Sequence, residues 1–355
     1  MIRRIDAAVF ESTGSLRGIS IMRVLTGAVV LLHLKHYLRD MGRGIYYGDS
    51  FHVPYLSWYP ELPRYAYWTA LSACAVAAVM MILGVLRRPA TWYVTGFVAY
   101  DLFLSKTNFH HNRALLLLML IGLSLASGPR IRSDERGPLW PIWWMRLEHS
   151  LIFFASGFSK LIDPDWLDGT VMLQRVIRYH DRIVRAGVPD SVIELLNEPT
   201  FHYWVSKAAI ATELFIAIGL WFGRTRLTAI WVALIFHISI EVGARVQVFG
   251  AMSMAAMLLW VTPQTRSRRA IVNTAARGGR RMRLLLRYLD WLARFEVETV
   301  DDPSAPPIDV DGATGSEASF LVLTRLPAVF FFVWPASGVA RVLRWLRPDG
   351  RQSRS

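Results

Sequence analysis

The chain has 355 residues, of which 53% are hydrophobic and 19% are charged, and its formal net charge is +13. Soluble domains carry about 25% charged residues, so this composition excludes an ordinary water-soluble protein and predicts an all-α bundle that spans a membrane several times. The single cysteine, Cys74, excludes an internal disulfide, a Cys-x-x-Cys redox pair and a cysteine-built metal site. No nucleic-acid-binding module accompanies the basic surplus, which we therefore assign to cytoplasmic loops.

Eight apolar segments are candidate membrane spans, since a crossing helix needs about 20 apolar residues. They lie at residues 19–38, 66–86, 90–105, 113–127, 141–162, 204–222, 227–244 and 247–262. The third and fourth segments are short, and one helical hairpin that does not fully cross is an alternative. Arginines gather in alternate links, which predicts that both termini are cytoplasmic and that 163–203 is a long outer loop.

The chain therefore divides into a cytoplasmic N-terminal segment (1–18), a transmembrane domain (19–262) and a basic cytoplasmic tail (263–355). We expect a multi-pass protein of the plasma membrane, with the lipid bilayer as its first partner.

This orientation places most titratable groups on the outer side. His237 and Glu241 are one helical turn apart and share a face, but two ligands do not make a metal site, so no metal is predicted. A histidine at a helix end is also commonly an interfacial hydrogen-bonding group. The other outer-side candidates are His110, His111, Asn112, Lys160, Asp163, Asp165 and Trp166.

Lys160 ends an apolar helix in a chain that has four lysines among its 40 basic residues. Arginine keeps its proton in proteins, whereas a desolvated lysine can release one and act as a base. The alternative is that the Lys160 side chain extends to the membrane interface.

Asp101 and Glu213 lie inside apolar segments, where a carboxylate is costly unless it is paired or faces a wet cavity. Arg23, also inside a segment, is the natural partner for either one. Such a pair has a structural or a functional role.

Residues 155–169 read ASGFSKLIDPDWLDG. This stretch resembles the Ala-Gly-x-x-Lys-Leu-Asp-x-Asp-Trp-x-x-Gly signature of the vitamin K-dependent γ-carboxylase superfamily, also called the horizontally transferred transmembrane (HTTM) domain family. Three further stretches, 23–32, 109–116 and 236–250, are similar to other segments of that family. The resemblance covers about residues 15–262.

The resemblance implies a base at Lys160 with His237 and His111 as further catalytic residues. It implies binding roles for the other outer-side candidates and a quinone or vitamin K-type hydroquinone as the cofactor or substrate. The chain departs from the family at His111-Asn112, where the order of Asn and His is inverted and Asn112 takes the histidine position. It also lacks the large lumenal region that binds the carboxylase's substrate. Glutamate carboxylation is therefore not expected, and a bacterial SdpB-like protein, of the group associated with maturing secreted peptide toxins, is the better match.

The tail after residue 262 is expected to hold an amphipathic helix at 283–292, a strand at 295–300, a loop at 301–315 and a buried helix at 320–334. This order resembles a thioredoxin-like DCC domain in which Ala276 and Gly279 replace both cysteines, so no thiol–disulfide exchange is possible. A basic tail without a fold, lying on anionic lipid, is the alternative.

Three functions follow from these observations. The first is a membrane enzyme that uses Lys160 as a base on a lipid-soluble, quinol-type or peptide substrate. The second is a non-enzymatic accessory or immunity protein that binds a secreted peptide through the aromatic loop at 39–65. The third is a small-molecule transporter with Arg23, Asp101 and Glu213 along its path.

Overall fold

The computed structural model divides the chain into two compact units, residues 1–262 and 263–355, and we describe each by itself. The residues that the structure describes are 12–46, 49, 53–108, 111–126, 136–185, 187–244, 248–261, 268–290, 294–327, 329 and 335.

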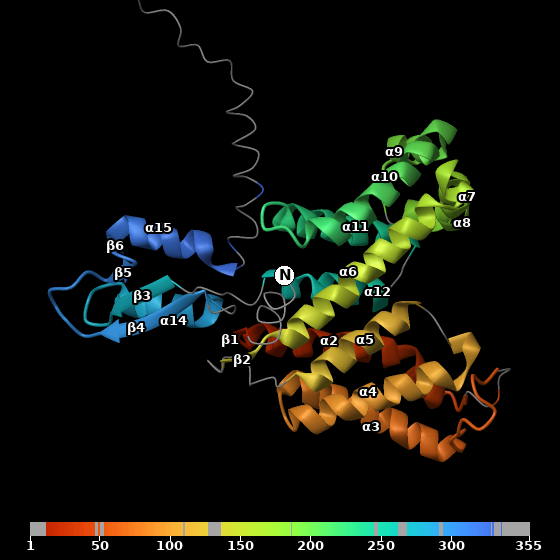
Figure 1. The fold of residues 1–355 in the computed structure, drawn as a ribbon, viewed down its shortest axis with the longest axis horizontal. Coiled ribbons are helices and arrows are strands. Elements are labelled where there is room, and N and C mark those ends of the chain that lie inside the picture. The colour runs from red at the N-terminus through yellow and green to blue at the C-terminus, as the bar shows by residue number, and fades with distance from the viewer. Residues whose placement is uncertain are drawn as a thin grey trace, which may run out of the picture. The chain divides into compact units, whose positions relative to one another are not determined.

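The first half of the helical unit is a group of four helices (Figure 1). They are α2 (Arg17–Gly42), α3 (Arg64–Leu83), α4 (Arg87–Leu104) and α5 (His111–Leu125), with the short η3 (Lys106–Asn108) before α5. Consecutive helices pack against one another, and α5 also packs against α2. Two short strands, β1 (Thr13–Ser15) just before α2 and β2 (Arg136–Pro138) just before α6, pair in an antiparallel manner.

The second half of this unit is centred on the long α6 (Trp140–Leu161), which packs against α10 (Pro199–Gly219). Next to α10 lies α11 (Arg226–Ala244), followed by α12 (Val248–Ala256) and α13 (Leu258–Val261). Because α12 contacts α2 and α5 as well as α11, it connects the two halves of the unit.

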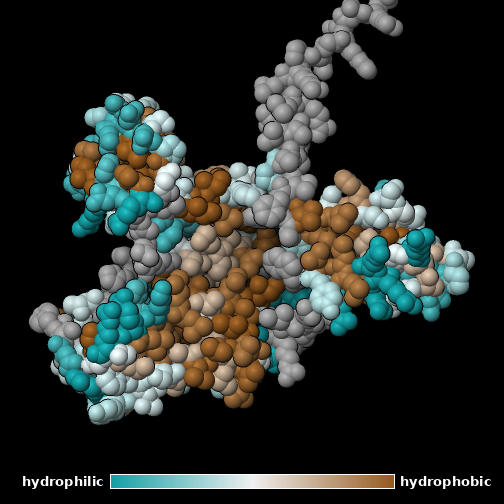
Figure 2. All heavy atoms as spheres, turned by 180° about the vertical axis from the view of Figure 1, so that it is seen from behind, coloured by the Kyte–Doolittle hydropathy of each residue, from teal (hydrophilic) through white to brown (hydrophobic). Residues whose placement is uncertain are grey.

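All eight predicted apolar segments form helices, the last one divided into α12 and α13. By length and composition, α2 and α3 are apolar and long enough to cross a membrane, and residues 113–125 and 248–261 form shorter apolar helices. Hydrophobic side chains cover the middle of the helical unit in Figure 2, while hydrophilic residues gather toward its ends. The number of crossings and the orientation of the termini stay predictions.

The segment 163–203, expected as a long outer loop, is largely helical, and its place on the outer side stays a prediction. This segment forms α7 (Pro164–Leu167), α8 (Thr170–Arg185) and α9 (Asp190–Asn197), all of which pack against α10. Val176 and Ile183 of α8 lie seven residues apart and are both buried. Two helical turns separate them, so the apolar periodicity of an amphipathic helix was present beneath the many charges.

The C-terminal unit is an α/β module, not an unfolded tail. It consists of β3 (Arg268–Asn273), α14 (Gly279–Leu289), β4 (Phe295–Val300), β5 (Ile308–Val310), β6 (Ala313–Thr314) and α15 (Gly315–Arg325). The strand order is β4-β3-β5-β6, in which β3 and β4 are parallel and the other pairs are antiparallel.

The structure confirms the predicted strand at 295–300 and corrects two other expectations for the tail. The expected loop at 301–315 contains β5 and β6, whose short strands gave too little pattern to detect. The buried helix expected at 320–334 is corrected at its start: residues 320–325 belong to α15, which begins at Gly315, and Phe320 is 67% exposed, while residues 327, 329 and 335 are also helical. Residues 328 and 330–334 lie outside the described residues.

The connection from β3 to α14 requires glycine at position 279. A Cβ atom there would lie 1.7 Å from the carbonyl oxygen of Asn273, closer than any real contact. The Asn273 side chain is fully buried, and its amide nitrogen donates to the carbonyl oxygens of Asp302 and Ala305. The start of α14 is therefore held against a rigid loop that cannot move aside.

We predict that Gly279→Ala destabilises the C-terminal unit by about 3 kcal/mol, because the added methyl group forces the backbone apart. Limited proteolysis of the purified chain should show faster cleavage within residues 268–325. The neighbouring exposed variant Arg280→Ala is the control and should resist cleavage as the parent does. Equal resistance of Gly279→Ala would contradict this account of the connection.

Candidate functional site

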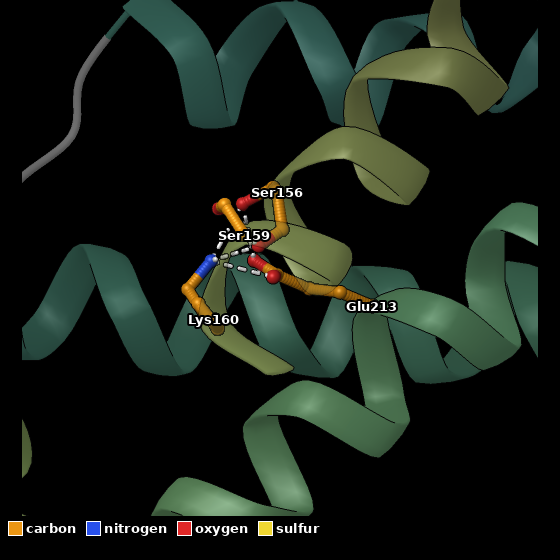
Figure 3. Close-up of polar contacts among 4 residues, drawn as sticks. All are labelled: Ser156, Ser159, Lys160 and Glu213. Atoms are coloured by element: carbon orange, nitrogen blue, oxygen red, sulfur yellow. Dashed lines mark hydrogen bonds and ion pairs between the residues drawn. The ribbon is translucent and has the colours of Figure 1, made fainter. Parts of the chain in front are cut away.

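Lys160 is held in a closed polar network between α6 and α10 (Figure 3). Its Nζ lies 2.5 Å from Glu213 Oε2, 2.5 Å from Ser156 Oγ and 3.3 Å from the Ser156 carbonyl oxygen. Ser156 Oγ in turn donates to Glu213 Oε1 at 3.2 Å. The two charged side chains are only 15% and 8% exposed. An ammonium group has three N–H donors, and all three have an acceptor here.

The local sequence explains how the network forms. Ser156 and Lys160 are four residues apart on α6, so they lie on the same helical face. Gly157 faces α10: a Cβ there would lie 3.0 Å from the Leu214 side chain and 3.2 Å from Glu213 Cβ. The missing side chain lets the two helices approach closely enough for the carboxylate to reach the amine.

The acidic residues after Lys160 form two successive helix caps. The Asp163 carboxylate accepts a hydrogen bond from the Asp165 backbone N–H at 3.0 Å and caps α7. Asp168 accepts from the Thr170 N–H at 2.8 Å at the start of α8, and this hydrogen bond lowers the pKa of Asp168. Asp163 therefore has a structural partner, and the Asp165 side chain is exposed. Sequence reasoning assigned both to substrate binding, which stays a prediction.

The same turn places Trp166 beside the amine. Its ring centroid is 5.0 Å from Lys160 Nζ and 5.2 Å from the Arg175 guanidinium carbon, and its carbonyl oxygen accepts from the Ser206 hydroxyl of α10. Gly169 has a φ of +90°, and a Cβ there would lie 2.7 Å from the Tyr203 nitrogen. Only glycine allows the turn to lie this close to α10, so the turn, Trp166 and Lys160 are fixed together.

A second polar cluster lies farther along α6, toward its N-terminus. His149 and His237 both contact the Phe153 ring, with centroids 5.1 Å and 5.5 Å away, and His237 also contacts Phe249. The Trp260 indole donates to His149 Nδ1 at 3.3 Å, so the His149 hydrogen belongs on Nε2. Both imidazoles are at most 1% exposed, and within the described part of the chain neither Nε2 has a hydrogen-bond partner.

Sequence reasoning identified His237 but missed His149. The signal was available, because Glu148 and His149 interrupt the apolar run of 141–162, and a titratable residue inside such a run indicates a special environment. Glu148 is 8% exposed.

On α6 the backbone of Lys160 and the His237 cluster lie at different levels, although the Lys160 amine reaches back to Ser156, three residues after Phe153. Phe153, which His237 contacts, lies seven residues before Lys160, or about 10 Å along the helix. Glu241 is one turn beyond His237, and its Oε2 would lie 3.7 Å from a Cβ on Gly250. His110 lies outside the described residues, and of His111 and Asn112 only the backbone, at the start of α5, is described.

The expected partners of the other buried charges differ from those observed. Asp101 accepts a hydrogen bond from the Tyr67 hydroxyl at 3.0 Å and lies 3.9 Å from Arg113. The Arg23 guanidinium instead donates through Nε to the Met81 carbonyl oxygen. Glu213 is paired with Lys160, and the expected transport path stays a prediction. Among the described residues no group of three His, Cys, Asp or Glu side chains could hold a metal ion.

With this geometry established, comparison with known proteins assigns the family. The sequence model of the HTTM domain matches residues 15–264, from just before α2 to just after α13. The chain belongs to the HTTM domain family and is a membrane protein of that family. No curated protein and no solved structure matches the chain.

We predict that Glu213→Gln destabilises the helical unit by about 3 kcal/mol, because it leaves the largely buried Lys160 ammonium without its carboxylate. Thermal unfolding in detergent, followed by tryptophan fluorescence, measures the loss. The double variant Lys160→Met/Glu213→Leu should be more stable than Glu213→Gln, since it removes both charges. Strictly additive effects of Lys160→Met and Glu213→Leu would show that the two side chains do not interact.

Proposed function

We propose that this protein is a multi-pass plasma-membrane enzyme that removes a proton from a lipid-soluble substrate, with Lys160 and Glu213 as a coupled pair. The observation that supports this proposal is the closed network of Lys160, Ser156 and Glu213, which holds a rare lysine against a carboxylate in a low-dielectric environment.

The network indicates how the amine becomes a base. With all three N–H groups engaged, Lys160 has no lone pair for a substrate proton. Transfer of one proton from Nζ to Glu213 Oε2, 2.5 Å away, leaves a neutral amine beside a neutral carboxylic acid. The amine then accepts a proton from a substrate hydroxyl: the O–H bond breaks, an N–H bond forms, and the substrate becomes an anion. The Ser156 hydroxyl keeps Lys160 and Glu213 aligned throughout.

The surroundings of the pair favour a substrate that arrives through lipid. At the end of α6 that carries Lys160, Phe158, Leu161 and the following residue Ile162 are 48%, 44% and 66% exposed, so exposed apolar side chains surround this helix end. A quinol-type molecule fits this apolar approach, and the resemblance to vitamin K-dependent enzymes supports the same class. The Lys160 amine contacts Ser156, three residues or about 4.5 Å along α6 from Phe153, which His237 contacts. A lipid-soluble substrate that lies along this stretch of α6 contacts both groups. His111 keeps its predicted catalytic role, and Glu241 its predicted binding role.

The decisive experiment compares Lys160→Arg with Lys160→Met. Arginine keeps the positive charge and can pair with Glu213, but it does not release its proton. We predict that both variants lose conversion of vitamin K hydroquinone by the protein in lipid nanodiscs under air, measured by chromatography against empty nanodiscs. Lys160→Arg should unfold near the parent temperature. Parent-level conversion by a folded Lys160→Arg variant would exclude Lys160 as the base.

A second candidate function is the SdpB-like one, in which the protein assists maturation of, or immunity to, a secreted peptide. The observation that favours it is the aromatic outer loop, where Trp58 and Tyr65 are 74% and 79% exposed. Arg64, which forms an ion pair with Asp49 at 2.7 Å, lies near the rings of Tyr46 and Trp68 and keeps this region ordered.

The two candidates give opposite results with the same variants. If the protein acts through its outer loop, we predict that Trp58→Ala/Tyr65→Ala abolishes protection of cells from, or production of, a peptide toxin encoded beside the gene, while Lys160→Arg retains it. Trp92→Ala, on α4 and 51% exposed, is a matched aromatic control outside this loop. The reverse pattern would support the enzyme.

The C-terminal module is proposed to be a thioredoxin-like, DCC-type domain without thiols. Its support is the order strand–helix–strand, two antiparallel strands and a final helix, with β3 at the centre beside β4. Residues 276–279, which align with the Cys-x-x-Cys positions, lie where β3 leads into α14. Without a cysteine there, the module's role is structural or in binding.

A further inference from the structure

Both helices of the C-terminal module cover the same face of its sheet. Leu286 of α14 and Val322 of α15 share one core with the inward residues of β3 and β5. The members of that core are Ala270, Val272, Leu286, Phe295, Ile308, Val310, Ala318, Val322 and Leu326. The module therefore has two different surfaces: an open sheet face and the outer side of two helices.

The open sheet face is suited to water. By the strand register, Arg269 is paired with Glu296, and Ile271 with both Glu298 and Asp309, all on the face opposite the core. Arg269 and Glu298 form an exposed ion pair at 2.7 Å, with the side chains 62% and 53% exposed. Three carboxylates against one guanidinium make this face acidic.

The outer side of the helices is apolar instead. Leu284 and Tyr288 lie one turn apart on α14, about opposite the buried Leu286, and are 47% and 54% exposed. On α15, Phe320 and Leu323 are 67% and 43% exposed. A monomer in water does not gain by exposing four such side chains on one side of so small a module.

Arginines flank the apolar side chains of α14, while α15 has the exposed Glu317 one turn before Phe320. Arg280, Arg281 and Arg287 of α14 are exposed, and on a helical projection they flank Leu284 and Tyr288. Exposed apolar side chains flanked by arginine on one surface, with carboxylates on the opposite one, are the charge pattern of a helix that lies in the interface of an anionic membrane.

We propose that the outer side of α14 and α15 docks onto the anionic leaflet of the membrane in which the preceding helices sit. Six residues, 262–267, separate α13 from β3 and span at most about 25 Å, so the module stays near the bilayer. Constant proximity raises the effective concentration of the lipid surface far above that of a soluble partner. The acidic sheet face then points to the aqueous phase. This proposal is independent of the function of Lys160.

The test uses the full-length protein in nanodiscs, with a nitroxide label on one introduced cysteine in a Cys74→Ala background. Leu284→Cys reports the helix side, and Glu296→Cys, in the same module, is the matched control on the sheet face. In nanodiscs containing phosphatidylglycerol, we expect the label at 284 to lose accessibility to a water-soluble nickel complex and to gain accessibility to oxygen. The label at 296 should remain accessible to nickel.

Two further measurements distinguish protection of position 284 by lipid from protection by protein. Nanodiscs of phosphatidylcholine alone, or high salt, should return the 284 label toward water. Combined reversal of Arg280, Arg281 and Arg287 to glutamate should do the same while the module stays folded by circular dichroism. Equal nickel accessibility of both labels in anionic nanodiscs would overturn the proposal. Protection of position 284 that is the same in detergent, neutral and anionic lipid would also overturn it, because protein would then cover this side.

Discussion

The close approach of α6 and α10 is the constraint on which the rest of the site depends. Removing an amine and a carboxylate from water costs several kcal/mol per ion, and only a short, well-oriented contact with further hydrogen bonds compensates for it. Glu213 and Lys160 meet this requirement through the 2.5 Å contact and the hydroxyl of Ser156. That geometry exists because residue 157 has no side chain to separate the helices.

The residues that follow Lys160 support the same contact from its far side. Asp163 and Asp168 end one helix and begin two more within a few residues, and Gly169 lets that turn touch the backbone of α10. The ring of Trp166, which belongs to this turn, is consequently held beside the Lys160 amine. The stretch 155–169 thus has a physical explanation: Lys160 supplies the amine, and the residues after it form the turn that holds Trp166 beside that amine.

How far the sequence predicts this structure depends on whether a feature is local or tertiary. The eight apolar helices and the strand at 295–300 were predictable because each has its own periodicity or composition. The Lys160–Glu213 pair was not, since 53 residues separate its members and Arg23 was an equally good partner on charge alone. Helix α8 was missed for another reason: its arginines and acids suggested a loop, although Val176 and Ile183 already marked a buried face. The sequence shows His149 only as a titratable residue inside an apolar run. Its contact with Trp260, and an Nε2 without a hydrogen-bond partner among the described residues, are tertiary features that the sequence does not predict.

The C-terminal module is a small α/β unit that contains no cysteine. Its stability resides in the apolar core beneath the two helices, in the buried Asn273 amide that holds the loop before β5, and in the absence of a side chain at Gly279. The distinctive property of the module is the contrast between its two surfaces. The fold places apolar side chains on the outer side of α14 and α15 and carboxylates on the open sheet face. The proposed orientation, with the helices against an anionic surface, therefore follows from the fold.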